Sequence, residues 1–231
     1  MRALLFDLDG TLTQGGGAGS RALARALQAR KGSLAELRNL RLDGMTDRAI
    51  TRILLAVDHH DKTLPLPARL ELVNEADIDE VLTAYLAALE EECAKRAYLP
   101  QPGIAVLVEQ LAGTAGVILG LGTGNLQRGA ELKLRSAGLW GPWRFGGYGS
   151  DAEPREEIIR TAWLRAQALG ATEGLVIGDT PRDISAAHQA GLPALAVATG
   201  RYTLDELAEN GADQVAQDFS DTEKALRLLL D

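Results

Sequence analysis

Four short apolar runs, spread along most of the chain, constrain what this sequence can fold into. They cover residues 3–8, 116–122, 174–179 and 194–200. Nearly every residue in each run is apolar, as expected of strands in a parallel sheet that is covered on both faces. Segments with helical spacing of apolar residues accompany them, at residues 103–112, 126–137, 155–169 and 183–190. This alternation predicts an α/β fold with a Rossmann-like open parallel sheet, in which ligands bind beyond the carboxyl ends of the strands.

Residues 14–98 follow a different pattern, because they contain no long strand-like run. Apolar spacing predicts helices at residues 18–31, 45–57 and 77–97, and Pro65 and Pro67 are expected to break the segment between the last two. We therefore predict an all-helical cap at residues 14–98, inserted into a core formed by residues 1–13 and 99–231. The Gly-rich residues 15–19 and the proline-containing residues 98–103 are the expected connections.

Charge and composition narrow the classes of protein that this chain could be. Lys and Arg number 24 against 32 Asp and Glu, and the net charge of −8 argues against a nucleic-acid partner. The longest uncharged stretch, 110–127, is rich in Gly and Thr and therefore does not predict a membrane helix. The single Cys93 rules out an internal disulfide, and Asp7 interrupts the first apolar run, so that we expect a cytoplasmic protein without a signal peptide. We expect a monomer or a homodimer with a small-molecule partner.

Acidic residues follow two of the predicted strands directly. Asp7 and Asp9 come at the end of the first strand, and Asp179 and Asp183 at the end of the third. Because the carboxyl ends of parallel strands share one edge of the sheet, these side chains should converge there. Carboxylates brought together repel one another, and a hard dication with oxygen ligands relieves that repulsion. The pattern therefore predicts a Mg²⁺ site.

Four motifs occur in a fixed order around these strand ends. They are FDLDGTL (6–12), GLGTGN (120–125), EPREEI (153–158) and GDTPRD (178–183). Together they resemble the motifs of the haloacid dehalogenase superfamily in its phosphatase form. DGMTDRAI (43–50) is similar to a cap loop of the phosphoglycolate phosphatase-like branch. The resemblance implies a Mg²⁺-dependent phosphatase with a helical cap, which hydrolyses a small phosphorylated metabolite through an aspartyl-phosphate.

The same resemblance implies roles for single residues. Asp7 would be the nucleophile, and Asp9 would protonate the leaving oxygen and later activate water. Mg²⁺ would be held by Asp7, by the main chain of Asp9 and by Asp179, with support from Asp183. The phosphoryl group would contact Leu8, Thr123, Gly124, Asn125 and Arg155.

Three assignments leave alternatives open. Arg155 stands where the family usually has Lys, so that Arg144 or Arg160 could take its place. In the cap loop, Thr46, Asp47 and Arg48 could contact the substrate, or Thr46 or Asp47 could simply be a helix N-cap. Asp183 could likewise be an N-cap.

Other functions compete with the phosphatase interpretation. A phosphosugar mutase similar to β-phosphoglucomutase would share both core and cap. A phosphonoacetaldehyde hydrolase would need a cap lysine for a Schiff base, and the cap offers Lys31, Lys62 and Lys95. A dinucleotide-binding oxidoreductase is disfavoured because Asn125 replaces the last glycine of its loop. A binding protein without catalytic activity could use the same fold.

Overall fold

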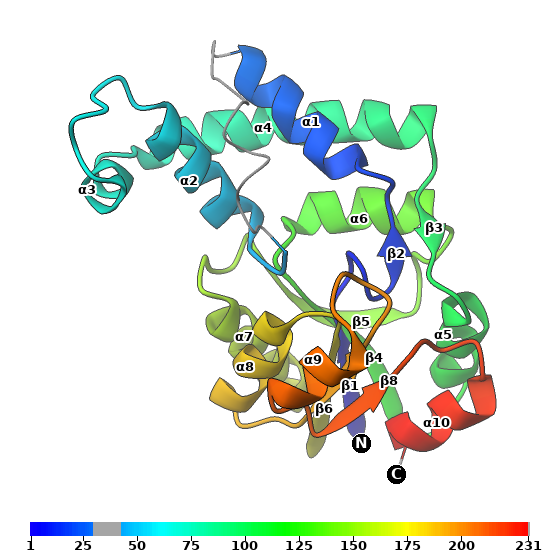
Figure 1. Cartoon of the computed structure of the whole chain (residues 1–231). Helices are drawn as coiled ribbons and strands as arrows, with labels where there is room; N and C mark the ends of the chain where they lie inside the picture. Colours follow the sequence, from blue (N-terminus) through cyan, green and yellow to red (C-terminus); the bar gives the residue numbers. More distant parts are fainter. Residues whose placement is uncertain (30–42, 231) are drawn as a thin grey trace.

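Six parallel strands form the central sheet of the computed structural model, which describes residues 1–29 and 43–230 (Figure 1). Their spatial order is β5 (Trp143–Tyr148), β4 (Val117–Thr123), β1 (Arg2–Phe6), β6 (Glu173–Gly178), β7 (Ala194–Val197) and β8 (Gln214–Ala216). β1 is central, and its neighbours on both sides are strands that come later in the sequence. The open α/β sheet predicted from the apolar runs is therefore confirmed.

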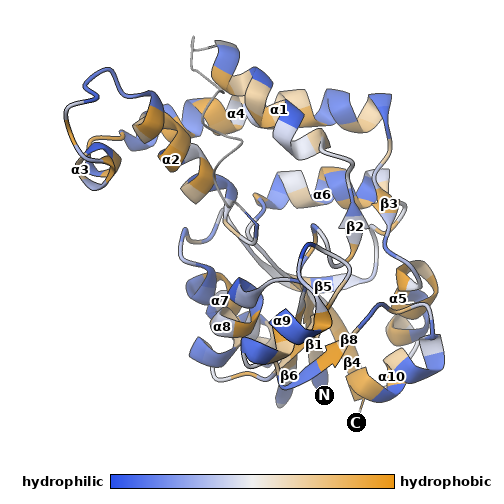
Figure 2. Cartoon of the chain, viewed as in Figure 1, coloured by the Kyte–Doolittle hydropathy of each residue, from blue (hydrophilic) through white to orange (hydrophobic). Residues whose placement is uncertain are grey.

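Helices cover both faces of this sheet. One apolar cluster joins the sheet to α5 (Ile104–Ala112), α6 (Gln127–Ser136) and α10 (Thr222–Leu230). A second cluster, on the other face, joins it to α7 (Arg155–Ala168), α8 (Pro181–Gln189) and α9 (Leu204–Glu209). These helices carry both hydrophilic and hydrophobic residues (Figure 2), as expected of helices with one buried side.

The two edge strands were not predicted. β5 is interrupted by two glycines and a charged Arg144, and β8 has only three residues. Neither segment has the continuous apolar character that marks a central strand, because an edge strand has one neighbour and is less completely covered.

The helical segment between β2 and β3 lies beside the core and builds a third apolar cluster, here called the cap cluster (Figure 1). Its helices are α1 (Ala18–Ala29), α2 (Asp47–Asp58), α3 (Leu66–Glu71) and α4 (Glu75–Lys95). α1, α2 and α4 correspond to the predicted helices, although residues 30 and 31 of the first lie outside the described residues. α3 was missed: Pro65 is its N-cap and Pro67 lies in its first turn, where proline favours a helix instead of breaking it.

One helix of the core also belongs to the cap cluster. Leu126 is the N-cap of α6, and Leu132 lies in the middle of the helix. Both are buried against residues of α1 and α4 such as Ala22, Tyr85 and Leu89. In Figure 1, α6 lies between the sheet and the pair α1 and α4. α6 therefore connects the core to the helical insert.

The chain leaves and re-enters the core side by side. β2 (Thr13–Gln14) pairs antiparallel with β3 (Leu99–Pro100), so that the two connections form a short ribbon. The domain limits that we predicted at residues 14 and 98 stay a prediction. Within the described part of the chain, no helix is both long and apolar enough to span a membrane.

Candidate active site

The register of three adjacent strands brings the predicted motifs together. Phe6 of β1 lies opposite Leu121 of β4 and Ile177 of β6. All three strands therefore end within two residues of one another, and the main chain of Asp7 still donates to the Ile177 carbonyl, at 2.8 Å. The residues that follow these strands form one site at the carboxyl edge of the sheet, where open α/β sheets bind ligands.

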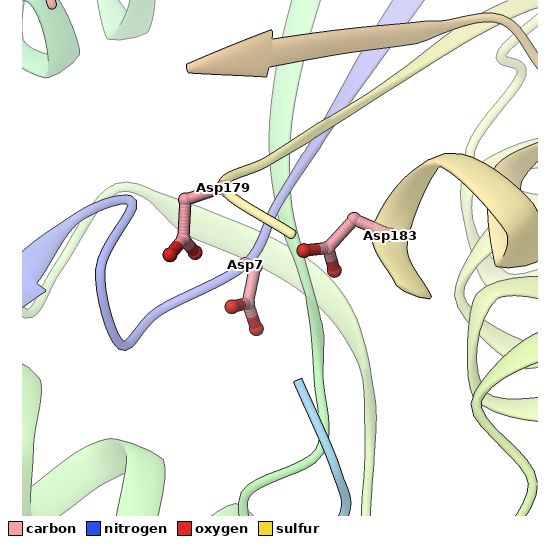
Figure 3. Close-up of side chains that lie close together, drawn as sticks. All are labelled: Asp7, Asp179 and Asp183. Carbon is pink, nitrogen blue, oxygen red and sulfur yellow. The ribbon is translucent and has the colours of Figure 1, made fainter. Parts of the chain in front are cut away.

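Three buried carboxylates meet at this edge. Asp7, Asp179 and Asp183 each contribute an oxygen, and these oxygens lie within 4.8 Å of one another. Figure 3 shows the side chains of Asp7 and Asp179 at the ends of neighbouring strands, with Asp183 on the first turn of α8. Three acids buried this close together need a cation to balance them.

Asp183 is the most fully hydrogen-bonded of the three. Its Oδ1 accepts from Nε and Nη2 of Arg155, at 2.9 and 2.5 Å, and its Oδ2 accepts from the main chain and hydroxyl of Thr180. Thr180 is the N-cap of α8, and Asp183 completes the capping box three residues later. Gly178 leaves the space for this arrangement, because a Cβ there would lie 2.2 Å from Asp183 Cγ.

Asp179 rests on a tight turn of the first motif. Its Oδ1 accepts from the Thr11 hydroxyl at 3.0 Å. Beneath it, Gly10 has a φ of +92°, and a Cβ at that position would lie 2.3 Å from Asp179 Oδ2. Gly10 therefore serves both the left-handed turn and the close approach of the carboxylate.

Arg155 provides the buried positive charge of the cluster. Its Nη2 lies 2.7 Å from Asp7 Oδ1 and 2.5 Å from Asp183 Oδ1. Of the two alternatives, Arg144 is exposed on β5, and Arg160 pairs with Glu157 at the surface. Of these three arginines, the structure brings Arg155 to the acidic cluster.

Burial controls the ionisation of the two strand-end acids. It raises the pKa of Asp7 to about 6, although the charge of Arg155 acts in the opposite direction. Burial and the negative charges of Asp183 and Asp7 raise the pKa of Asp179 well above its usual range, against the opposite effects of the Thr11 hydrogen bond and the charge of Arg155. Among the described residues, Asp7 Oδ1 has no partner with hydrogen-bond geometry despite its ion pair with Arg155. An unsatisfied buried carboxylate oxygen next to a second acid fits a hard divalent cation.

The raised pKa of Asp7 makes a prediction about the stability of the metal-free protein. The folded chain holds the Asp7 proton up to about pH 6, whereas the unfolded chain releases it near pH 3.8. The stabilising contribution of the protonated form is therefore complete below pH 3.8 and is lost as the pH rises through 6. In EDTA, Asp7→Asn should become more stable than wild type as the pH rises from 5 to 7.5, by on the order of 1–3 kcal/mol. Thermal unfolding of both proteins measures this; a difference that does not change with pH would contradict it.

The side chain of Asp9 does not join the carboxylate cluster. Its Oδ2 accepts from Asn125 Nδ2 at 2.9 Å and from Lys133 Nζ at 2.5 Å. Lys133 was not predicted as a site residue, yet it is buried on α6. A sequence signal for it exists: Lys133 falls at helical spacing with the apolar Leu126, Ala130 and Ala137. The metal contact that we assigned to the Asp9 main chain stays a prediction.

The second motif forms a loop beside these acids. Thr123 is fully buried, and its hydroxyl oxygen accepts from the Asn125 main chain and from Asn125 Nδ2, at 3.3 and 2.9 Å. Gly124 and Asn125 line the adjoining cavity. Leu8 is buried, and its carbonyl accepts from the main chains of Leu12 and Thr13, both at 2.9 Å. The phosphate contacts predicted for these four residues stay predictions.

The loop before α2 brings the helical insert to this site. Thr46 is the N-cap of α2 and accepts from the Ala49 main chain at 3.1 Å. Asp47 bridges insert and core: its main chain donates to Gly124 O, and its Oδ2 accepts from the Leu126 main chain, both at 2.9 Å. Asp47 therefore lies at the contact between insert and core and also lines the cavity, and the substrate contact predicted for it stays a prediction.

Arg48 contacts acidic residues of α4, and the substrate contact predicted for it stays a prediction. Its guanidinium pairs with Glu75 and Asp79, at 2.6 and 2.7 Å. The cavity-lining residues of this loop are Asp43, Gly44, Met45 and Asp47. Arg52 on the same helix reaches the core and pairs with Glu153, at 2.8 Å, two residues before Arg155.

A cavity of about 610 Å³ opens above the carboxylates. The core contributes charged and polar walls, and the helical insert contributes mainly apolar and aromatic ones, together with the carboxylates of Asp43 and Asp47. The lining residues include Asp7, Asp9, Asn125, Lys133, Arg155 and Asp179 from the core, and Leu23, Ile50, Leu82 and Tyr85 from the insert. The site can therefore hold an anionic group at the sheet edge and the remainder of a small molecule beneath the helices.

Comparison of the sequence with known proteins identifies the family to which the chain is similar. Residues 1–191 match the haloacid dehalogenase-like hydrolases. A protein described as probable phosphatase IndB, from Dickeya dadantii, is 30% identical over 234 residues, which cover 98% of this chain and 94% of that protein. A phosphoglycolate phosphatase from Caulobacter vibrioides is 30% identical over 156 residues, which cover 66% of this chain and 62% of that protein.

Solved structures share the fold. CbbY from Rhodobacter sphaeroides, in complex with phosphate, has a TM-score of 0.72 at 23% identity, with 95% of each chain covered. A hydrolase from Pseudomonas syringae has a TM-score of 0.71 at 22% identity, with both chains fully covered. With its parallel sheet, its acidic strand ends and its match over residues 1–191, the chain belongs to the haloacid dehalogenase-like hydrolases.

Proposed function

We propose that this protein is a Mg²⁺-dependent phosphatase that hydrolyses a small phosphorylated metabolite through an aspartyl-phosphate, similar to phosphoglycolate phosphatases. The observation that carries the proposal is the cluster of Asp7, Asp179 and Asp183 around Arg155 at the sheet edge. The names of the two curated relatives, a probable phosphatase and a phosphoglycolate phosphatase, favour the same chemistry.

In this proposal Asp7 attacks the phosphorus atom. A new bond forms from a carboxylate oxygen of Asp7 to phosphorus, and the bond from phosphorus to the ester oxygen breaks. The buried guanidinium of Arg155, which already lies 2.7 Å from Asp7 Oδ1, would attract the phosphoryl oxygens and reduce their repulsion from the nucleophile. Asp7 and Asp179 would hold Mg²⁺ with support from Asp183, and the ion would neutralise charge on nucleophile and phosphate.

Asp9 would handle the protons of both steps. It gives a proton to the ester oxygen as that oxygen leaves, and the resulting carboxylate takes a proton from the water that attacks the aspartyl-phosphate. Its side chain is 47% exposed and lines the cavity above Asp7, so that it can face a leaving group from the side of the helical insert. The products are inorganic phosphate and the free alcohol.

The charge state of the cavity lysine argues against a phosphonoacetaldehyde hydrolase. Burial alone would lower the pKa of Lys133, but the negative charge of Asp9, with smaller contributions from Tyr85, Tyr98 and Asp47, outweighs burial and raises the pKa well above the usual range. An ammonium cannot attack a carbonyl to form a Schiff base. Of the three insert lysines, Lys62 donates to the Val57 carbonyl, Lys95 pairs with Glu91 and Glu92, and Lys31 lies outside the described residues.

A mutase interpretation has weaker support. Putative β-phosphoglucomutases are among the solved structures with this fold, for example one from Bacteroides vulgatus with a TM-score of 0.69 at 19% identity. Such a likeness concerns the fold. A measurement of inorganic phosphate separates the two activities, because a phosphatase releases phosphate, whereas a mutase transfers the phosphoryl group back to the sugar.

The test of the proposed function combines a substrate panel with Asp9→Asn. Wild type should release phosphate from at least one small phosphate ester, and Asp9→Asn should slow that release by about 10²–10⁴-fold. With p-nitrophenyl phosphate, the first release of nitrophenolate should be less affected, because nitrophenolate leaves without being protonated, whereas the later release of phosphate should still be slow. Asp205→Asn, on the exposed first turn of α9, is the matched control and should match wild type. Absence of phosphate release from the whole panel, or full activity of Asp9→Asn, would contradict the proposal.

A further inference from the structure

Lys133 is a buried charge to which neither the sequence motifs nor the proposed chemistry assigns a role. It lies near the middle of α6, and 4% of its surface is exposed. Its Nζ donates to Asp9 Oδ2 and to Asn125 Oδ1, both at 2.5 Å. Asn125 Nδ2 in turn donates to Asp9 Oδ2 and to Thr123 Oγ1, both at 2.9 Å. The three side chains form a closed set of contacts in which Asp9 is held from two sides.

The surroundings of Lys133 make Asp9 its principal counter-charge. The other nearby groups are the Tyr98 ring, whose centre lies 5.7 Å from Lys133 Nζ, the buried Tyr85, and the carboxylate of Asp47, which acts on Lys133 less strongly than Asp9 and accepts from the Leu126 main chain. A buried ammonium is costly unless it is paired and hydrogen-bonded. Asp9 supplies that pairing at its carboxylate, and Asn125 supplies an amide oxygen.

Stability alone is a poor reason for such a pair. Replacing a buried ion pair with apolar side chains of similar size is often neutral or stabilising. Lys133 lies beside Tyr98 and Tyr85, which belong to the cap cluster, so that a methionine at position 133 would find aromatic and apolar partners. Asp9, with a side chain 47% exposed, can recover its hydration when the lysine is absent. The pair is therefore better explained by what it does to Asp9.

We propose that Lys133 is a positioning residue for Asp9. Lys133 holds the Asp9 carboxylate on the cavity side, where that carboxylate must reach the leaving oxygen and the attacking water. The inference rests on the proposed phosphatase function. Asp9 comes from the turn after β1, and without Lys133 only Asn125 would hold its side chain among the described contacts. Lys133, fixed on a packed helix, restricts the side-chain rotation of Asp9 before the substrate arrives.

The two chemical steps should respond differently to the loss of Lys133. Attack by Asp7 on p-nitrophenyl phosphate needs no proton from Asp9, because nitrophenolate is a stable anion. Breakdown of the aspartyl-phosphate still needs Asp9 to take a proton from water. Lys133→Met should therefore release one equivalent of nitrophenolate quickly and then turn over slowly. A purely structural defect would lower both phases together.

The experiment measures pre-steady-state and steady-state turnover of the full chain with Mg²⁺. For Lys133→Met we expect a burst of nitrophenolate close to the enzyme concentration, followed by a steady rate about 10–100-fold below wild type. An alkyl phosphate accepted by wild type should lose at least as much in kcat, without a burst. Arg135→Met, on the same helix but exposed and paired with Glu131, is the matched control and should behave as wild type. Thermal unfolding checks that both variants are folded, and Lys133→Gln replaces Lys133→Met if the latter is not.

A double variant separates positioning from direct substrate contact. If Lys133 acts through Asp9, adding Lys133→Met to Asp9→Asn should change the remaining rate by less than about twofold. Three results would each overturn the inference. They are a double variant whose loss equals the product of the two single losses, a wild-type rate in Lys133→Met, and a rise in KM for acidic substrates with kcat unchanged. If wild type itself releases no phosphate from any ester, the proposed function has failed instead.

Discussion

Asp7→Asn should reduce phosphate release to the background rate, a loss of at least about 10⁴-fold. The amide cannot attack phosphorus, and no other carboxylate can take its place. Among the described residues, Asp183 has both oxygens engaged by Arg155 and Thr180, and Asp179 rests on Gly10 and Thr11. Turnover of the best substrate from the panel, measured with excess enzyme, gives the size of the loss.

The covalent intermediate provides the control for that result. Wild type that is acid-quenched during turnover should carry a phosphoryl group on the peptide containing Asp7, detected by mass spectrometry, and Asp7→Asn should carry none. The variant should still fold, because it removes a buried charge whose pKa is raised to about 6 by burial. Near-normal turnover by a folded Asp7→Asn protein would exclude the covalent mechanism.

Removal of divalent metal should have an effect of similar size. In EDTA, the carboxylates of Asp7, Asp179 and Asp183 repel one another and also repel the phosphate of the substrate. Arg155 is then the neighbouring positive charge that offsets this repulsion. We expect activity to fall to background and to return when Mg²⁺ is added in excess. Mg²⁺ should also raise the melting temperature of wild type, because an ion that binds the folded state stabilises it.

The matched variant for this experiment is Asp179→Asn. It removes one proposed ligand and leaves Asp7 and Arg155 in place, so that it should lose both the activity and most of the Mg²⁺-dependent rise in melting temperature. Unchanged activity of wild type in EDTA, or an equal thermal shift in Asp179→Asn, would exclude the metal assignment.

The sequence predicted the sheet and the acidic strand ends because their signals are local. A strand covered on both faces must be apolar throughout. A charged residue directly after such a run, as at Asp7 or Asp179, therefore indicates where the strand ends. The register then follows from the pairing of β1 with β4 and β6, which places the ends together. The edge strands β5 and β8 were not predicted, because each pairs with a single neighbour and therefore lacks the continuous apolar pattern of a central strand.

The side-chain directions could not be read from the sequence in the same way. Asp9 and Asp7 are two residues apart, yet one contacts Lys133 and the other Arg155. That difference depends on how the turn after β1 packs against α6, a contact between residues 124 positions apart. Arg48 shows the same limit: its charge suggested a substrate contact, and its pairing with Glu75 and Asp79 depends on where α4 begins.

The shared packing of α6 has a consequence for engineering this protein. Both termini lie on the far side of the sheet from α1 and α4 (Figure 1), so that an exchange of residues 14–98 between relatives would leave the ends of the chain untouched. Such a chimera would, however, place foreign helices against Leu126 and Leu132, which are buried among the native ones. The smallest transferable module is therefore discontinuous, because a graft that also carries α6 would preserve the packing of Leu126 and Leu132 against α1 and α4.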